Sequence, residues 1–300
     1  MDEDIIKKYV KAGDIAKRVR TEAAKKSKPG MKLVELANYI EQRIRELGGE
    51  PAFPVNLSVN NIAAHYTPVI DDEATIPDNA VLKIDIGVHV DGYIADTAIS
   101  VTFNPAYESL LEASEKALER ALEIVKPGVK VSEIGKIIEE TIVSMGYKPI
   151  RNLTGHSMDR YIIHSGLTIP NYWDKSAGWR LTNGAYAIEP FATTGIGLVR
   201  EDNVVTIFSL RTGKPRTRLS FTEKKIVDYV WNTRKRLPFC ERWLKSMVSS
   251  LDGLRNTISG LIRKGVVTVY PVLVEKTNGI VAQFEHTILI SGKDVIVTTL

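Results

Sequence analysis

The sequence has almost no cysteine and almost no glutamine. One cysteine, Cys240, occurs among 300 residues, which excludes an internal disulfide framework and a zinc site built from cysteines. Glutamine occurs only at Gln42 and Gln283, a scarcity that hints at a hot habitat. These absences remove the disulfide-rich secreted proteins and the cysteine-zinc proteins from consideration.

Long apolar runs are also missing. No run of roughly 18 apolar residues occurs, so we expect no membrane span. The first ten residues, MDEDIIKKYV, are charged and lack the apolar centre of a signal peptide. Together with the single cysteine, this predicts a cytoplasmic protein. With 44% hydrophobic and 25% charged residues, the composition is ordinary for a soluble globular protein of one large domain or two smaller ones.

An internal repeat organises the chain. The segments KPGMKLVELANYIEQRIRELG (28–48) and KPGVKVSEIGKIIEETIVSMG (126–146) share nine of 21 residues at a constant offset of 98. Each begins with Pro-Gly and continues as an amphipathic helix that ends before glycine. Each also follows a longer helical stretch, at 3–27 and 105–125. The chain is therefore predicted to contain two similar halves, packed about a pseudo-two-fold axis.

The first half contains the stretch DIGVHVDGYIAD, residues 85–96. Asp91-Gly92 predicts a two-residue hairpin turn, which pairs Gly87 with Asp96. Asp85 and Asp96 then lie on one face as diagonal neighbours, with Cβ atoms roughly 7 Å apart. Gly87 has no side chain to fill the space between them. Two carboxylates on an apolar hairpin require a counter-charge, so we expect a cation there, unless both carboxylates face solvent.

The second half repeats the carboxylates in the same order. AIE at 187–189 resembles KID at 83–85, and EHTIL at 285–289 resembles DTAIS at 96–100. Glu189 therefore matches Asp85, and Glu285 matches Asp96. If the halves pack about the pseudo-two-fold axis, four carboxylates converge, and metal, expected as two ions, is needed to tolerate them. The alternative is four unrelated surface acids.

A long insert, 196–278, separates the two strands of the second half. Between Ser209 and Ser246 it carries 11 Lys or Arg against three acidic residues, a net charge of +8. Its sequence predicts short helices broken at Leu237-Pro238 and at Gly253. The basic face would contact RNA or the ribosome, or would simply be solvated. Neutralising the run from Arg234 to Arg236 is expected to leave the chemistry intact.

Three of the five histidines are candidates for the site. His156, in NLTGHSMD, follows a second copy of the Asn-Leu-Ser/Thr motif and would join the four carboxylates. His164 follows eight residues later, and His65 occupies the comparable loop of the first half, which predicts catalytic roles for both. His89 is expected to be structural. His286 is expected to point away from Glu285, because successive strand residues face opposite sides.

The ordered set Asp85, Asp96, His156, Glu189 and Glu285 resembles that of the pita-bread metallopeptidases. The segments NNIAAHYTP, KIDIGVHVDGYIADTA, NLTGHSM, IEPFA and AQFEHTILI look like signatures of the methionine aminopeptidases, and the resemblance spans essentially the whole chain. The insert with LPFCERWL looks like the type 2 class, and the short N-terminal region like its archaeal members. One departure is GIGLVRED after Glu189, where eukaryotic members have a stretch richer in histidine.

The resemblance implies a fold and a domain organisation. The fold is α+β: two helix–helix–β-hairpin halves form the pita-bread catalytic domain, residues 1–195 and 279–300. Residues 196–278 form the insert, including its basic helical subdomain.

The resemblance also implies roles for the site residues. Asp96 and Glu285 would bridge two divalent ions (Co, Mn, Fe or Zn), with Asp85 on one and His156 and Glu189 on the other. Glu189 would shuttle a proton, His164 would bond the scissile carbonyl, and His65 would lie on the leaving-group side. The methionine pocket would be lined by Phe53, Ile163 and Tyr270, unless these residues merely pack in the core.

The implied activity is removal of the N-terminal methionine from nascent proteins and peptides, with a small second residue preferred. Aminopeptidase P and prolidase share the five ligands, so an Xaa-Pro aminopeptidase or prolidase-like peptidase is the alternative. Those enzymes carry a separate N-terminal domain, which we do not expect for this protein. A non-catalytic pita-bread protein that binds RNA or the ribosome is the other alternative, although such relatives lose ligands. The family suggests a monomer.

Overall fold

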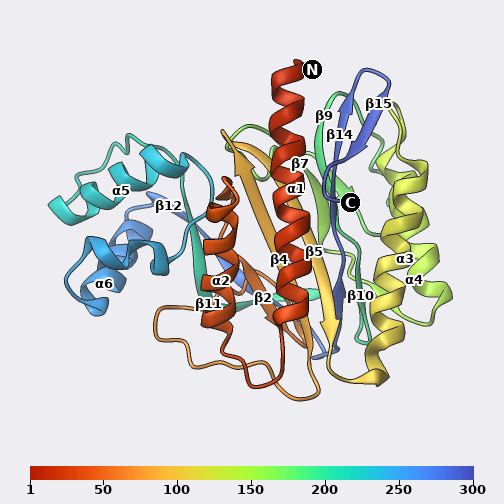
Figure 1. Ribbon diagram of the computed structural model, residues 1–300, viewed down its shortest axis with the longest axis horizontal. Helices are drawn as coiled ribbons and strands as arrows, with labels where there is room; N and C mark the ends of the chain where they lie inside the picture. Colours follow the sequence, from red (N-terminus) through yellow and green to blue (C-terminus); the bar gives the residue numbers. More distant parts are fainter.

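The computed structural model describes residues 1–300 and confirms the two halves. In the first half, α1 (Glu3–Lys26) and α2 (Leu33–Glu46) cover one face of a sheet (Figure 1). In the second half, α3 (Glu108–Ile124) and α4 (Val131–Ser144) take the same place, after the short 3-10 helix η1 (Pro105–Tyr107). The Pro-Gly motifs share one backbone conformation, with φ of 77° at Gly30 and 86° at Gly128.

The sheet of the first half places the first two carboxylates. It pairs β4 with β1, β2 and β5, whose bounds are β1 (Glu50–Pro51), β2 (Asn56–Val59), β4 (Val81–Val90) and β5 (Tyr93–Thr102). The predicted register is confirmed, because Gly87 pairs with Asp96. Asp91 and Gly92 form the turn, with φ of 52° and 87°, as a type I′ turn requires.

Gly87 does not leave the empty space that its sequence suggested. A Cβ at this position would lie 2.3 Å from the ring of Phe53, so the glycine allows that ring to lie flat against the strand. The expectation of a gap beside Asp96 was therefore wrong. The missing side chain at Gly87 instead leaves room for Phe53, which lines a cavity between the two halves.

The second half builds a five-stranded sheet in the order β15-β14-β9-β7-β8. Its strands are β7 (Thr154–Met158), β8 (Thr168–Pro170), β9 (Gly184–Ile188), β14 (His286–Ser291) and β15 (Asp294–Val297). Glu189 follows β9 directly, and Glu285 precedes β14. These two strands pair, with His286 opposite Ile188. A bridge between Ala98 and Glu285 joins β5 of the first half to this sheet.

Each half buries its own apolar core. One core lies between α1, α2 and the first sheet, and the other lies between α3, α4 and the second sheet. A small sheet joins β6 (Lys148–Pro149), β10 (Phe191–Thr193) and β13 (Val281–Gln283). No helix is both long and apolar enough to cross a membrane.

The insert is a β-ribbon that carries three helical segments, at the left of Figure 1. The ribbon pairs β11 (Val199–Leu210) with β12 (Val267–Glu275), and β12 also pairs with β3 (Ile62–Ala64) of the first half. Between them lie α5 (Phe221–Arg234), the 3-10 helix η2 (Glu241–Met247) and α6 (Leu251–Arg263). The helices pack a separate apolar cluster against the end of the ribbon at which β11 ends and β12 begins.

Two expectations for the insert were wrong. Gly253 does not break a helix, because it lies in the first turn of α6, where its N–H donates to the Ser250 side chain that caps the helix. Arg234 does not belong to the solvated basic surface, since it is 6% exposed and its side chain donates to the carbonyl oxygens of Pro51 and Pro238. The break at Leu237-Pro238 is confirmed, because α5 ends at Arg234.

Candidate metal centre

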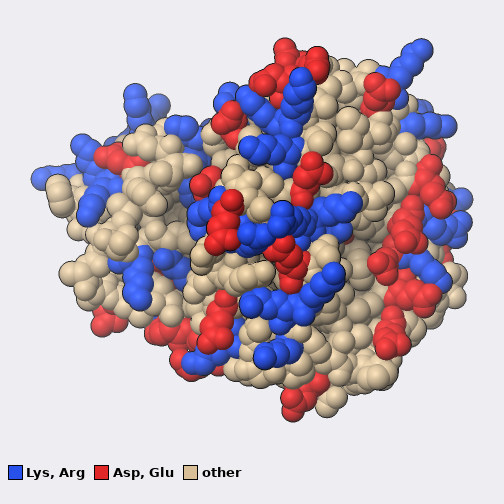
Figure 2. All heavy atoms as spheres, in the orientation of Figure 1, with Lys and Arg blue, Asp and Glu red and all other residues tan.

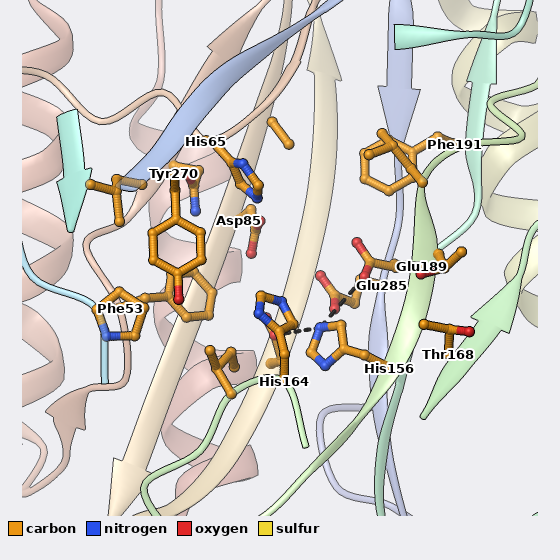
Figure 3. Close-up of a pocket in the computed structure, with 18 of the residues that line it drawn as sticks. Phe53, His65, Asp85, His156, His164, Thr168, Glu189, Phe191, Tyr270 and Glu285 are labelled. Atoms are coloured by element: carbon orange, nitrogen blue, oxygen red, sulfur yellow. Dashed lines mark ion pairs between the residues drawn. The ribbon is translucent and has the colours of Figure 1, made fainter. Parts of the chain in front are cut away.

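The four carboxylates and the imidazole of His156 converge between the two halves (Figure 3). Asp85 comes from β4, Asp96 from β5, and His156 from β7, while Glu189 and Glu285 flank β9 and β14. His156 Nε2 lies 3.6 Å from Asp96 Oδ2 and 3.5 Å from Glu189 Oε1. Ligand atoms of Asp96, His156 and Glu285 all lie within 4.8 Å of one another.

The cluster is buried and its oxygens are not satisfied by the protein. Asp96 is 3% exposed and Glu285 is 1% exposed. Asp85 Oδ1, Asp96 Oδ1 and Glu285 Oε1 are buried without any hydrogen-bond partner. Buried carboxylate oxygens without partners are strongly unfavourable unless a cation balances them. The donor set of hard oxygens and one imidazole therefore fits divalent metal ions.

The carboxylates of the cluster repel one another. Burial and the neighbouring carboxylates Asp85 and Glu189 hold the pKa of Asp96 well above its ordinary value, and the pKa of Glu285 is raised for the same reasons. Burial raises the pKa of Asp85 to about 7. Burial also lowers the pKa of His156, which leaves a neutral imidazole that can bind metal. A metal-free cluster thus keeps protons that a bound cation would displace.

This electrostatic conflict predicts how the stability of the protein depends on pH and metal. The folded-state pKa of Asp85 lies above its unfolded value of roughly 3.9, so the metal-free folded state loses stability as the pH rises from about 4 through about 7. Bound metal removes this penalty. We expect the difference in Tm between metal-loaded and metal-free protein to widen from pH 5 to pH 8 in calorimetry. A difference that narrows over this range would contradict the buried carboxylate cluster.

All ten residues singled out in the sequence line one cavity of about 350 Å³. Besides the five converging residues, they are Phe53, His65, Ile163, His164 and Tyr270. Phe53 and Ile163 are 7% and 6% exposed and share an apolar cluster, so each packs in a core and lines the cavity as well. The cavity therefore has a polar floor at the carboxylates and an apolar wall.

His164 and His65 lie beside the carboxylates in the cavity (Figure 3). The ring of His164 lies 4.4 Å from that of His156, centre to centre, and the ring of His65 lies 5.8 Å from that of Tyr270. His164 is exposed to solvent in the cavity, but desolvation by the surrounding protein, with a smaller contribution from His65, lowers the pKa of its imidazole to about 4, so the ring is neutral near pH 7. His65 Nδ1 lies 3.2 Å from the carbonyl oxygen of Pro271.

Sequence reasoning missed three polar residues around the cluster. The Gln283 amide donates to Glu189 Oε2 at 3.5 Å and to Glu285 Oε2 at 3.4 Å. Lys83 is fully buried and donates to two main-chain carbonyls, which ties β4 to β13. Asn56 pairs with Asp85 across β2 and β4 and lines the cavity. The sequence offered one signal for Lys83 and Gln283. Each stands two residues before a candidate ligand, Asp85 or Glu285.

Comparison with known proteins identifies relatives over the whole chain. Residues 7–209 match the model of metallopeptidase family M24. The chain is 46% identical to the methionine aminopeptidase of Methanocaldococcus jannaschii, with 100% of both chains covered. It is 44% identical to that of Saccharolobus solfataricus, covering 100% of this chain and 99% of the relative. The solved structure of a thermophilic Arx1, 19% identical, shares the fold with a TM-score of 0.85 over 99% of this chain and 91% of its own.

Proposed function

The chain belongs to metallopeptidase family M24, and from that premise we propose that it removes the N-terminal methionine from nascent proteins and peptides. The family makes it a hydrolase with the pita-bread fold. One observation carries the proposal: five residues with metal-binding side chains converge at the floor of a cavity that has an apolar wall. Relatives of the same length that bear the name methionine aminopeptidase support the choice of substrate.

The five converging residues would hold two divalent ions, of cobalt, manganese, iron or zinc. Asp96 and Glu285 would contact both ions, Asp85 would hold one of them, and His156 and Glu189 would hold the other. The ions, when bound, would activate a water molecule and polarise the scissile carbonyl. The Gln283 amide would keep the carboxylates of Glu189 and Glu285 oriented toward the ions, as hydrogen bonds to metal ligands usually do.

Three side chains would act on the substrate itself. Glu189 would take a proton from the attacking water and pass it to the leaving amine, because its carboxylate lines the cavity beside His156, within reach of the reacting groups. His164 is neutral near pH 7 and would donate a hydrogen bond to the carbonyl oxygen as negative charge develops there. His65, whose ring neighbours that of Tyr270 as the ring of His164 does, would contact the leaving side of the peptide.

The cavity wall would set the specificity. Phe53, Ile163 and Tyr270 provide apolar surface suited to an unbranched side chain. A small second residue would be favoured, because the leaving side passes close to His65. A proline-specific peptidase is the main alternative, since it uses the same metal ligands. The full-length match to relatives without an additional domain favours the methionine enzyme.

A set of four peptides tests the proposal. We expect metal-loaded protein to release methionine from Met-Ala-Ser, to cleave Leu-Ala-Ser and Met-Lys-Ser poorly, and to leave Ala-Pro-Ala intact, as followed by chromatography of the products. An altered branch in an apolar pocket changes specificity by only about 1–3 kcal/mol, so some cleavage of the leucine peptide is compatible with the proposal. Preference for Ala-Pro-Ala would favour the prolidase-like alternative. No cleavage with any of the four metals would favour a binding protein.

A contact with the ribosome stays a prediction. Basic side chains project from the outer part of the insert around α5 (Figure 2), although Arg234 is not among them. Such a face would bring the cavity near emerging chains by electrostatic attraction. Cosedimentation with ribosomes that does not weaken as salt rises would argue against it. A monomeric state, a cytoplasmic location and the division into a catalytic domain and an insert at 196–278 also stay predictions.

A further inference from the structure

Two segments that wall the cavity lie against the insert. One segment, 51–55, carries Phe53, and the other, 65–72, carries His65. His65 has a φ of 66°, a left-handed conformation that is unfavourable for a residue with a side chain and persists only where the surroundings hold it. The contacts that hold this segment are therefore relevant to the position of the His65 ring.

The insert reaches the His65 segment through Arg242 of η2. Its Nη2 donates to Thr67 Oγ1 at 2.9 Å, and its Nε donates to the carbonyl oxygen of Pro68 at 2.8 Å. Thr67 is two residues from His65. The same guanidinium makes two parallel hydrogen bonds of 2.7 Å to the carboxylate of Glu41 on α2. Both side chains are buried, with exposures of 5% and 3%.

Glu41 contacts the other wall segment. Its carboxylate accepts hydrogen bonds from the backbone N–H of Val55 at 3.3 Å and from Trp243 Nε1 at 2.7 Å. Val55 is two residues from Phe53. One buried ion pair therefore touches the segment of Phe53 and the segment of His65. The planar guanidinium is required for this arrangement, since a lysine cannot make two parallel bonds to Glu41 and also reach Thr67 and Pro68.

We propose that Arg242 and Glu41 are positioning residues of the proposed aminopeptidase, which act on turnover through His65 and on substrate binding through Phe53. The insert would then contribute to catalysis through Arg242, which lies outside the basic run from Arg234 to Arg236. The inference rests on the proposed function, because the effects of the variants are measured with the same peptides.

The test combines Arg242→Lys with His65→Ala in the metal-loaded full chain. With Met-Ala-Ser, we expect R242K to lower kcat/KM by about tenfold, because small misplacements of active-site groups have effects of that size or larger. Metal content should stay at the wild-type level. In the H65A background, R242K should cause no further fall in kcat, and its effect on KM, exerted through Phe53, should remain.

Lys264→Gln provides the matched control. Lys264 contacts the buried carboxylate of Glu223 at 2.5 Å and links α6 to α5, so its loss removes a partly buried cation from the insert without touching either wall segment. K264Q should lower Tm and leave kcat and KM unchanged at temperatures where it is folded. If R242K folds poorly, Glu41→Gln, which keeps the size of the side chain, is tested instead, alone and together with His65→Ala.

Two results would overturn the proposal. One is an R242K variant that behaves like K264Q, with a lower Tm and wild-type kcat and KM. The other is an equal loss of kcat from R242K with and without His65, which would mean that the two residues act independently. If the unmodified protein cleaves no peptide, the proposed function fails instead, and that measurement precedes the variants.

Discussion

Asp96→Asn should abolish most peptidase activity while the protein stays folded. Asp96 is buried between the two halves, next to His156, and its Oδ1 has no partner in the protein. The amide keeps the shape of the side chain but removes one negative charge from the centre, so metal binding should weaken. Because loss of a group that merely orients a metal ligand costs roughly 10–100-fold, we expect more than ~10²-fold here. Turnover of Met-Ala-Ser and metal content measure the effect.

The same hairpin offers a matched control. Asp91→Asn makes the same chemical change in the exposed turn between β4 and β5, where asparagine tolerates the left-handed conformation of that residue. Its activity and metal content should equal those of the wild type. D96N should also be no less stable than the wild type when both are metal-free, since the neutral amide replaces a carboxyl whose raised pKa already favours its neutral form. Wild-type activity of D96N at saturating metal would remove Asp96 from the centre.

His164→Ala should lower kcat strongly and leave the metal in place. The His164 ring lies in the cavity, 4.4 Å from the ring of His156, centre to centre. If it bonds the carbonyl oxygen in the transition state, its removal should cost roughly 10²–10³-fold in kcat. Measurement of kcat with Met-Ala-Ser and metal analysis of the same sample distinguish a loss of turnover from a loss of metal.

A loss of metal in proportion to the loss of activity would assign His164 a different role. It would then be a ligand, and the neutral-donor role would be wrong. His89→Ala serves as a comparison, because His89 is buried outside the cavity and accepts a hydrogen bond from the backbone of Gly92. That variant should lose stability and keep its kcat at temperatures where it is folded.

Local rules predicted the parts of the site that depend on neighbouring residues. The Asp91-Gly92 turn fixes the register of β4 and β5, because a two-residue loop permits only one alignment of the strands. The face shared by Asp85 and Asp96 followed from that register. The repeat then located Glu189 and Glu285, since two copies of one structural unit place matched residues near their common axis.

Contacts between distant segments could not be predicted in this way. Arg234 and Arg242 belong to a basic stretch that resembles a solvated surface, and only the packing of the insert on the segment 51–55 and on α2 shows that their side chains are buried. The ring of Phe53 over Gly87 depends on a close approach of two segments far apart in the chain. Gly253 was misassigned because a glycine in the first turn of a helix looks like a helix breaker when the cap is not recognised.

Hydrolysis would require that one centre, built from residues of both halves, binds metal. Anomalous diffraction from crystals soaked in Mn²⁺, with data on both sides of the manganese absorption edge, would locate the bound ions. We expect two anomalous peaks about 3.5–4 Å apart, each in contact with carboxylates of the five-residue cluster. Peaks confined to other acidic groups, or no peak between Asp96, His156 and Glu285, would contradict it.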